Sequence, residues 1–206
     1  ARPAAGRGPF TLLSVGRLVA KKGYDDLLAA LARLPPELDW RFRHVGGGDL
    51  SRRLKAEAGR LGLSARVSWL GKRARDDVFA EMRAADLFVL PSKIAPGGDR
   101  DGLPNVLMEA ASQRLPILST AVSAIPEFVR DGAEARLVPP GDPAALAEAI
   151  AALAAEPDTR ARLAAAAEAR LHARFGMEPG IDAVAARLAE ALGEAAPPAP
   201  LRLAGE

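Results

Sequence analysis

Short runs of apolar residues alternate along the chain with longer segments whose apolar residues recur at helical spacing. Such runs are typical of buried strands, and helical spacing is typical of helices that cover a sheet. The runs predict strands at residues 11–16, 40–46, 66–70, 86–90, 116–119 and 135–138. The intervening and following segments predict helices over 23–34, 49–61, 76–84, 104–112, 125–130, 143–154, 158–174 and 180–192.

Residues at the ends of these segments support the predicted boundaries. Pro35 ends the first helix, and Pro104 lies in the first turn of the helix over 104–112. Asp142 is predicted to cap the helix that starts at Pro143, and Asp49 to cap the helix over 49–61.

The alternation of strands and helices predicts the α/β fold class. We expect a doubly wound, Rossmann-like parallel sheet of about six strands with helices on both faces, followed by C-terminal helices. Residues 1–194 are predicted to form a single domain, and the Pro/Ala-rich segment 195–206 a tail. In such sheets ligands bind outside the carboxyl ends of the strands, so functional residues are expected directly after strands.

The composition of the chain excludes several kinds of functional site. The chain has no cysteine, which excludes disulfides, thiolate zinc sites and cysteine nucleophiles, and its two histidines are too few for a histidine-rich metal site. A net charge of +2 with only 4% aromatic residues argues against a nucleic-acid reader. No apolar run reaches the length of a membrane span, and residues 1–9 lack a signal-peptide core, so the expected compartment is the cytoplasm. His44 and His172 are interpreted as structural.

The first candidate site follows the first predicted strand. Gly16 and Arg17 end that strand, and Lys22 and Gly23 open the next helix. A glycine lets a phosphate approach the backbone, a helix start offers free N–H groups, and the two cations can converge on a diphosphate. The alternative is a polar loop with two solvated cations, in which Gly23 serves only the turn.

The second candidate site is the glycine run at 46–48, after the second strand. Three glycines permit close ligand approach. The dinucleotide fingerprint needs a further glycine that opens the next helix, and the sequence has none there. A flexible turn is therefore the favoured interpretation.

The third candidate site is the stretch from Asp99 to Glu109. Asp101 lies in a loop and can accept hydrogen bonds from sugar hydroxyls, while Glu109 lies inside the helix and can bind a ribose diol. The helix N-terminus between them can hold a phosphate. The alternative is an acidic cluster favoured by the helix dipole. Glu109 favours the binding role, because a carboxylate in the apolar stretch 106–111 needs a polar partner.

Four runs, taken in order, resemble one known family. They are SVGRLVAKKGYDDLLAAL, AADLFVLPSK, DGLPNVLMEAASQRLPILSTAVSAIPEFVRDG and LVPPGDPAALAEAI. Together they resemble the C-terminal, donor-binding domain of GT-B glycosyltransferases of family 4 (group 1). The resemblance covers residues 10–175 and is closest to the branch that builds polysaccharides, lipopolysaccharides or glycolipids.

The resemblance implies a site for a UDP- or GDP-type nucleoside diphosphate sugar, with no cofactor and no metal. It implies retention of anomeric configuration, by same-face attack in which the leaving diphosphate helps to deprotonate the acceptor. Arg17 and Lys22 would neutralise the diphosphate, Asp101 would contact the transferred sugar, and Glu109 would hold the ribose. The full set that the resemblance assigns to catalysis or donor binding is Gly16, Arg17, Lys22, Asp101, Gly102, Leu103, Asn105, Val106 and Glu109.

The sequence departs from the family pattern at several positions. Asp101 stands where glutamate is usual, which predicts altered sugar handling. Gln113-Arg114, Ala124 and Ala135-Arg136 replace small residues or glycines near the expected donor crevice, which predicts altered donor binding. Because the first strand begins near residue 11, the acceptor-binding N-terminal domain of these enzymes is expected to be missing, and the isolated domain to be inactive. Any association with the inner face of a membrane is expected through the full-length protein.

Two other functions stay open on the sequence. The substitution at Asp101 and the missing glycines also fit a non-catalytic subunit or nucleotide-binding module that docks on a partner protein. An NAD-dependent dehydrogenase or epimerase on the same fold is disfavoured by the failed dinucleotide fingerprint.

Overall fold

A computed structural model describes residues 8–192, and the predicted tail 195–206 lies outside the described residues. The strands are β1 (Phe10–Val15), β2 (Trp40–Val45), β3 (Val67–Gly71), β4 (Leu87–Leu90), β5 (Ile117–Thr120) and β6 (Arg136–Val138). The helices are η1 (Ala20–Lys22, a 3-10 turn), α1 (Tyr24–Leu31), α2 (Ser51–Arg60), α3 (Arg75–Ala84), α4 (Asn105–Ser112), α5 (Ile125–Phe128), α6 (Pro143–Ala155), α7 (Pro157–Arg174) and α8 (Met177–Leu192).

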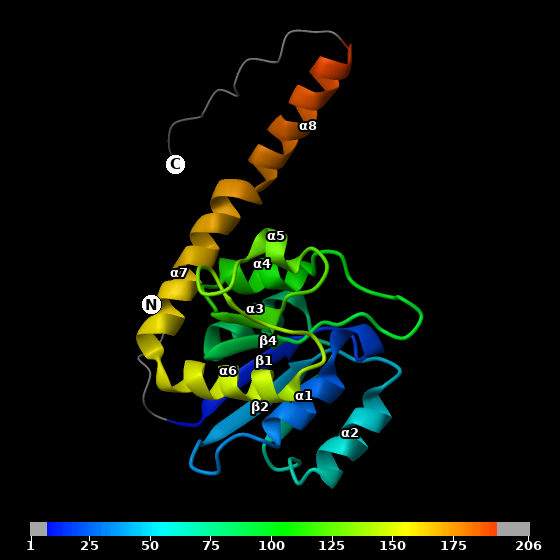
Figure 1. The fold of residues 1–206 in the computed structure, drawn as a ribbon, viewed down its shortest axis with the longest axis vertical. Helices are drawn as coiled ribbons and strands as arrows, with labels where there is room; N and C mark the ends of the chain where they lie inside the picture. Colours follow the sequence, from blue (N-terminus) through cyan, green and yellow to red (C-terminus); the bar gives the residue numbers. More distant parts are fainter. Residues whose placement is uncertain (1–7, 193–206) are drawn as a thin grey trace.

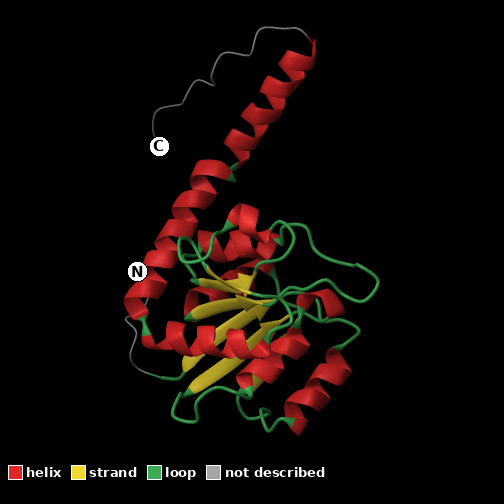
Figure 2. Ribbon diagram, in the orientation of Figure 1, coloured by secondary structure: helices red, strands yellow, loops and turns green. Residues whose placement is uncertain are grey.

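The six strands form one parallel sheet in the order β3-β2-β1-β4-β5-β6. Helices α1, α2 and α6 pack together on one face, and α3, α4 and α7 cover the other (Figures 1 and 2). The predicted doubly wound α/β fold is therefore confirmed. The chain builds outward from β1 to β3 and then returns to place β4 beside β1, so the strand order reverses between these two central strands.

The buried core explains why runs of apolar residues predict the strands of the sheet. All four residues of β4 are fully buried, as are Leu12 and Leu13 of β1, because helices cover both faces of the central strands. Trp40, Phe42, Phe88 and Phe128 fill the space between the sheet and its helices. Burial at about 25 cal/mol per Å² of apolar surface makes this core the main source of stability.

The predicted helix boundaries hold in one case and shift in others. The Asp142 side chain accepts hydrogen bonds from the N–H groups of Ala144 and Ala145 at 3.0 Å each, which confirms it as the cap of α6. The predicted cap at Asp49 is wrong, because α2 begins only at Ser51. The Leu50 N–H instead donates to the Leu18 carbonyl at 3.0 Å, which delays the helix by two residues.

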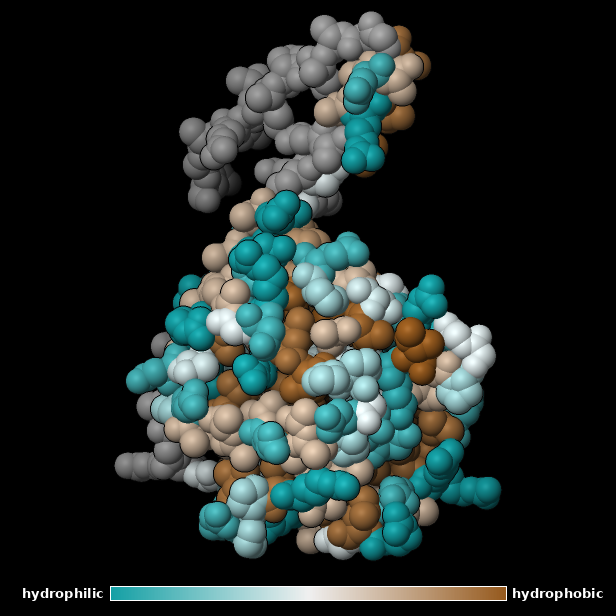
Figure 3. Space-filling model, viewed as in Figure 1, coloured by the Kyte–Doolittle hydropathy of each residue, from teal (hydrophilic) through white to brown (hydrophobic). Residues whose placement is uncertain are grey.

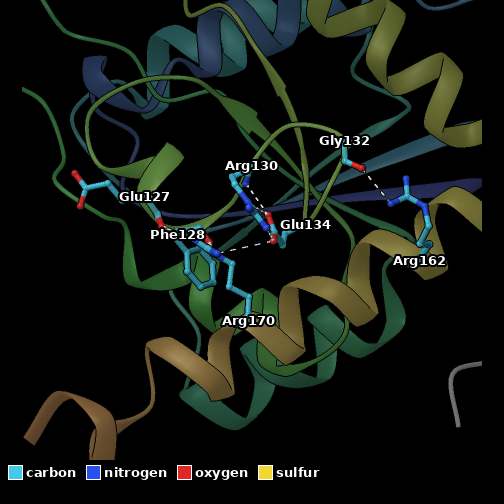
Figure 4. A network of polar contacts seen from close by, with 7 residues as sticks. All are labelled: Glu127, Phe128, Arg130, Gly132, Glu134, Arg162 and Arg170. Carbon is cyan, nitrogen blue, oxygen red and sulfur yellow. Dashed lines mark hydrogen bonds and ion pairs between the residues drawn. The ribbon is translucent and has the colours of Figure 1, made fainter. Parts of the chain in front are cut away.

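A polar network fastens the segment around α5 to α7 (Figure 4). The buried Glu134 carboxylate accepts three hydrogen bonds from Arg130, at 2.5–3.1 Å, and lies 4.0 Å from Arg170. Arg170 on α7 also donates to the carbonyls of Phe128 and Glu127, at 2.7 and 2.9 Å. One carboxylate and two arginines thus hold α5 against the C-terminal helices.

Helix α8 projects away from the sheet (Figure 1). Ile181, Val184, Leu188 and Leu192 recur at helical spacing along it, and each is more than half exposed. Figure 3 shows apolar atoms along this projecting helix. Across residues 8–192, none of the helices has the length and apolar character needed to cross a membrane.

Candidate functional site

The reversal of strand order brings two of the predicted sites to the same edge of the sheet. β1 and β4 are adjacent and parallel, so Gly16-Arg17 after β1 and the loop 91–104 after β4 leave the sheet side by side. In open α/β sheets, ligands bind at this kind of switch point, outside the carboxyl ends of the strands. The candidate site is therefore built from η1, this loop and the start of α4.

The turn after β1 is interlocked with the glycine run after β2. The Leu18 N–H donates to the Gly47 carbonyl at 2.9 Å, and the Leu50 N–H donates to the Leu18 carbonyl at 3.0 Å. A Cβ on Gly46 would lie 2.0 Å from the Gly16 carbonyl oxygen, so only glycine fits there. The predicted flexible turn at 46–48 is thus a tightly hydrogen-bonded support for the first site.

Gly23 joins η1 to α1 at a point of very close backbone contact. Its φ of 66° is left-handed, and a Cβ there would lie 1.9 Å from the Pro91 carbonyl oxygen. The glycine therefore does more than make a turn, because it lets η1 rest directly on the first residue of the loop 91–104.

Lysines of η1 and aspartates of the loop form a compact charged cluster. Lys22 Nζ lies 2.6 Å from Asp101 Oδ2, and Lys21 Nζ lies 3.4 Å from Asp101 Oδ1 and 3.0 Å from Asp99 Oδ1. Both lysine side chains are mostly buried, with 13% and 11% exposed for Lys21 and Lys22. The hydrogen bond to Asp99, with smaller contributions from Asp101, raises the pKa of Lys21, so its charge is secured.

The start of the loop is fixed separately by Lys93. Its N–H donates to the Lys21 carbonyl at 2.9 Å, and its Nζ lies 2.8 Å from both Asp25 and Asp26 in the first turn of α1. The loop is consequently tied to the β1–α1 connection at Lys93 and again at Asp99 and Asp101.

Two predicted site residues carry no partner. Arg17 is exposed after β1, and Glu109 is half-buried in the second turn of α4. Among residues 8–192 neither side chain has a hydrogen bond or ion pair. The partner that the apolar surroundings of Glu109 led us to expect is therefore not supplied by this part of the chain.

The start of α4 adds unpaired backbone donors between these groups. The helix begins at Asn105 after Pro104, and no side chain caps it. The first N–H groups of a helix have no intrahelical acceptor and carry the positive end of the helix dipole. Glu109 lies three and four positions after Val106 and Asn105, so all three share one helix face.

A buried aromatic pair lies beneath the turn after β1. Tyr24 and His44 are both buried, and their rings meet edge to face with centroids 4.7 Å apart. A Cβ on Gly16 would lie 2.8 Å from the Tyr24 hydroxyl, so the turn rests on that hydroxyl. Burial lowers the pKa of His44 to about 4, which keeps it neutral and supports its structural interpretation. Burial, with the nearby charge of Asp101, raises the pKa of Tyr24.

The structure brings Gly16 and Lys22 of the first predicted site into one cluster with Asp101 of the third. Asp99, which opens the third predicted site, belongs to the same cluster, as do Lys21 and Tyr24, which the sequence analysis did not select. The available signal was the Lys-Lys pair before Gly23 facing the acidic DRD segment at 99–101. Among the described residues no group of three or more metal-ligating side chains comes together.

Arg114 and Ala135 stand at positions where the family pattern has glycine, and the structure shows their surroundings. Arg114 has a left-handed φ of 51° just after α4, where an L-residue costs about 1–2 kcal/mol. Its guanidinium lies 2.5 Å from Glu168 on α7, so the substitution gains an ion pair that glycine would lack. Ala135 is fully buried, and its carbonyl accepts a hydrogen bond from Gly132.

Fold and site together define a doubly wound α/β domain with a cationic turn, a helix N-terminus and an unpaired carboxylate at the sheet's switch point. The sequence matches the family described as "Glycosyl transferases group 1" over residues 2–170. The chain belongs to this family.

Relatives named for polysaccharide and glycolipid assembly agree with this assignment. The lipopolysaccharide core biosynthesis glycosyltransferase LpsE of Rhizobium meliloti is 34% identical over 172 residues, which cover 84% of this chain and 47% of LpsE. A GDP-mannose-dependent phosphatidylinositol monomannoside mannosyltransferase of Mycobacterium tuberculosis is 29% identical over 184 residues, covering 88% of this chain and 47% of that protein.

A solved relative carries a bound donor. HepE of Anabaena, in complex with UDP-glucose, is 28% identical and superposes with a TM-score of 0.74, covering 90% of this chain and 49% of HepE. The chain thus spans about half the length of these relatives, or less.

Proposed function

We propose that this chain is the donor-binding domain of a glycosyltransferase and binds a nucleoside diphosphate sugar at the edge between β1 and α4. The observation that carries the proposal is that Arg17 and Lys22 follow β1 at the switch point where the loop 91–104 leads from β4 into α4, the uncapped helix that carries Glu109; among residues 8–192 the Arg17 and Glu109 side chains have no partner. These groups present positive charge and N–H donors for phosphates, and a carboxylate for a diol.

In this proposal the diphosphate lies between Arg17 and the first N–H groups of α4. Gly16 and Gly102 leave room for close approach, and the N–H groups around Leu103, Asn105 and Val106 face phosphate or sugar. Glu109, in the second turn of α4, accepts hydrogen bonds from the ribose hydroxyls. Asp101 contacts the transferred sugar from the loop.

The proposed reaction retains the anomeric configuration and requires no metal. As the bond to the sugar breaks, negative charge grows on the leaving diphosphate, and Arg17 and Lys22 would stabilise it. The leaving phosphate accepts the acceptor's proton on the same face. The base and the sugar are open: UDP-glucose in HepE and GDP-mannose in the mycobacterial relative's name support both UDP and GDP types.

We propose further that a second domain supplies the acceptor site, since the chain spans about half of HepE. The exposed apolar stripe of α8 offers that domain a surface to pack against. The acceptor would be a growing polysaccharide, lipopolysaccharide or glycolipid, and contact with a membrane would involve the full-length protein. Sugar transfer by the 206-residue chain alone would contradict this part of the proposal.

Titration calorimetry with UDP and GDP tests the donor site. We expect binding, reduced at least tenfold in Arg17→Ala and in Glu109→Ala, since each removes a charge-assisted contact of about 1.5–3 kcal/mol. Arg52→Ala is the matched control, because Arg52 is an exposed arginine on α2 with no partner between residues 8 and 192. If neither nucleotide binds at millimolar concentration, the proposal is wrong.

A non-catalytic module is the second candidate, motivated by Asp101 in place of glutamate. Such a module could bind nucleotide through Arg17 and Glu109, so calorimetry does not separate the two. Sugar transfer by the full-length protein does: activity lost in Asp101→Ala supports the enzyme, and a protein inactive with every donor supports the module.

A further inference from the structure

Lys22 is already occupied by a carboxylate of its own chain. Its Nζ lies 2.6 Å from Asp101 Oδ2, at a site where both side chains are at most one-fifth exposed. A lysine held this way must leave its partner, or share it, before it can bind a diphosphate. Separating a largely buried pair normally leaves an uncompensated carboxylate, which is costly.

Lys21 is placed to remove that cost. Its Nζ lies 3.4 Å from the other oxygen of Asp101 and 3.0 Å from Asp99. Its backbone is fixed as well, because the Lys21 carbonyl accepts the Lys93 N–H and Gly23 holds the turn against Pro91. Two lysines and two aspartates therefore balance in charge before any ligand binds.

We propose that Lys21 is a positioning residue that keeps Asp101 neutralised when Lys22 turns to the diphosphate. The inference rests on the proposed nucleotide site and adds a residue to it. Within residues 8–192 the ion pairs of the Lys21 side chain are with the two loop aspartates, and Lys21 does not need to touch the ligand. Without Lys21, the cation left beside Asp101 in this part of the chain is Lys22, and Lys22 is withheld from the phosphates.

A double-mutant cycle tests this arrangement, with calorimetry using UDP and GDP as probes. Lys21→Met is expected to weaken nucleoside diphosphate binding about tenfold, and Lys21→Arg to bind like the wild type. Adding Asp101→Asn to Lys21→Met should restore most of the affinity, because the amide no longer holds Lys22. UDP and GDP lack the transferred sugar that Asp101 is proposed to contact, so the change in affinity caused by Asp101→Asn reports on Lys22 alone.

Control variants separate positioning from folding. Lys55→Met removes an exposed lysine of α2 that has no partner in the described part of the chain, and it should leave affinity unchanged. Thermal melting of each variant shows whether it is folded. A purely structural Lys21 would give losses that add in the double variant, with no rescue.

Each outcome decides the question. Weak binding in Lys21→Met with rescue by Asp101→Asn supports the inference. Wild-type affinity in Lys21→Met, or a double variant no better than Lys21→Met, overturns it while leaving the nucleotide site intact. A wild-type chain that binds neither UDP nor GDP overturns the proposed function itself, and the inference with it.

Discussion

Replacing Gly23 by alanine tests how closely η1 must rest on the loop 91–104. The new Cβ would lie 1.9 Å from the Pro91 carbonyl oxygen, in a backbone region that disfavours L-residues. The left-handed backbone costs about 1–2 kcal/mol. Moving backbone apart to relieve the contact costs about 1–3 kcal/mol more. We therefore expect Gly23→Ala to lower the free energy of unfolding by about 3 kcal/mol.

Gly62→Ala is the matched control, because Gly62 has a φ of 73° but nothing within 4 Å of its Cβ position. It carries the same backbone penalty and the same change in the unfolded state, without the contact. Urea denaturation of both variants then isolates the effect of Pro91. Equal losses of unfolding free energy in the two variants would refute the close approach.

Two further predictions concern buried charge. Folding lowers the pKa of His44 from 6.5 to about 4. As the pH drops through this range, the unfolded chain therefore binds a proton before the folded chain does. We expect His44 to lower the free energy of unfolding by about 3 kcal/mol between pH 7 and pH 4. Urea titrations should show this loss reduced in His44→Leu, and an unchanged pH dependence would contradict it. Glu134→Gln should lower the free energy of unfolding by about 2 kcal/mol, because it leaves Arg130 and Arg170 without their carboxylate. Glu57→Gln, which breaks the exposed pair with Arg60, should change the free energy of unfolding far less, and similar effects in both variants would count against the network.

The sheet could be predicted from the sequence because its strands are covered on both faces. That covering makes apolar runs such as Leu87–Leu90 continuous and easy to recognise. The cap at Asp142 was equally local, since the residues it binds lie two and three positions away. The cap at Asp49 failed because the Leu50 N–H bonds the distant Leu18 carbonyl and the Ser51 N–H bonds the Gly48 carbonyl, so the chain is still in a turn where the helix was predicted to begin.

The site was predictable in its parts but not in its internal pairing. Arg17 follows a strand, Lys22 precedes a helix and Asp101 lies in the loop before one, which marks them in the sequence. The pairing of Lys21 with Asp99 spans 78 residues and depends on β4 returning beside β1. The Lys-Lys pair and the acidic segment 99–101 are visible in the sequence, but only the structure shows that Lys21 contacts Asp99.

A crystal structure of the chain with UDP or GDP bound tests the central claim most directly. We predict the diphosphate between Arg17 and the N-terminus of α4, the ribose hydroxyls on Glu109, and Lys22 moved from Asp101 toward a phosphate oxygen. Nucleotide found elsewhere on the domain, with Arg17 and Glu109 still unpaired, would contradict the account.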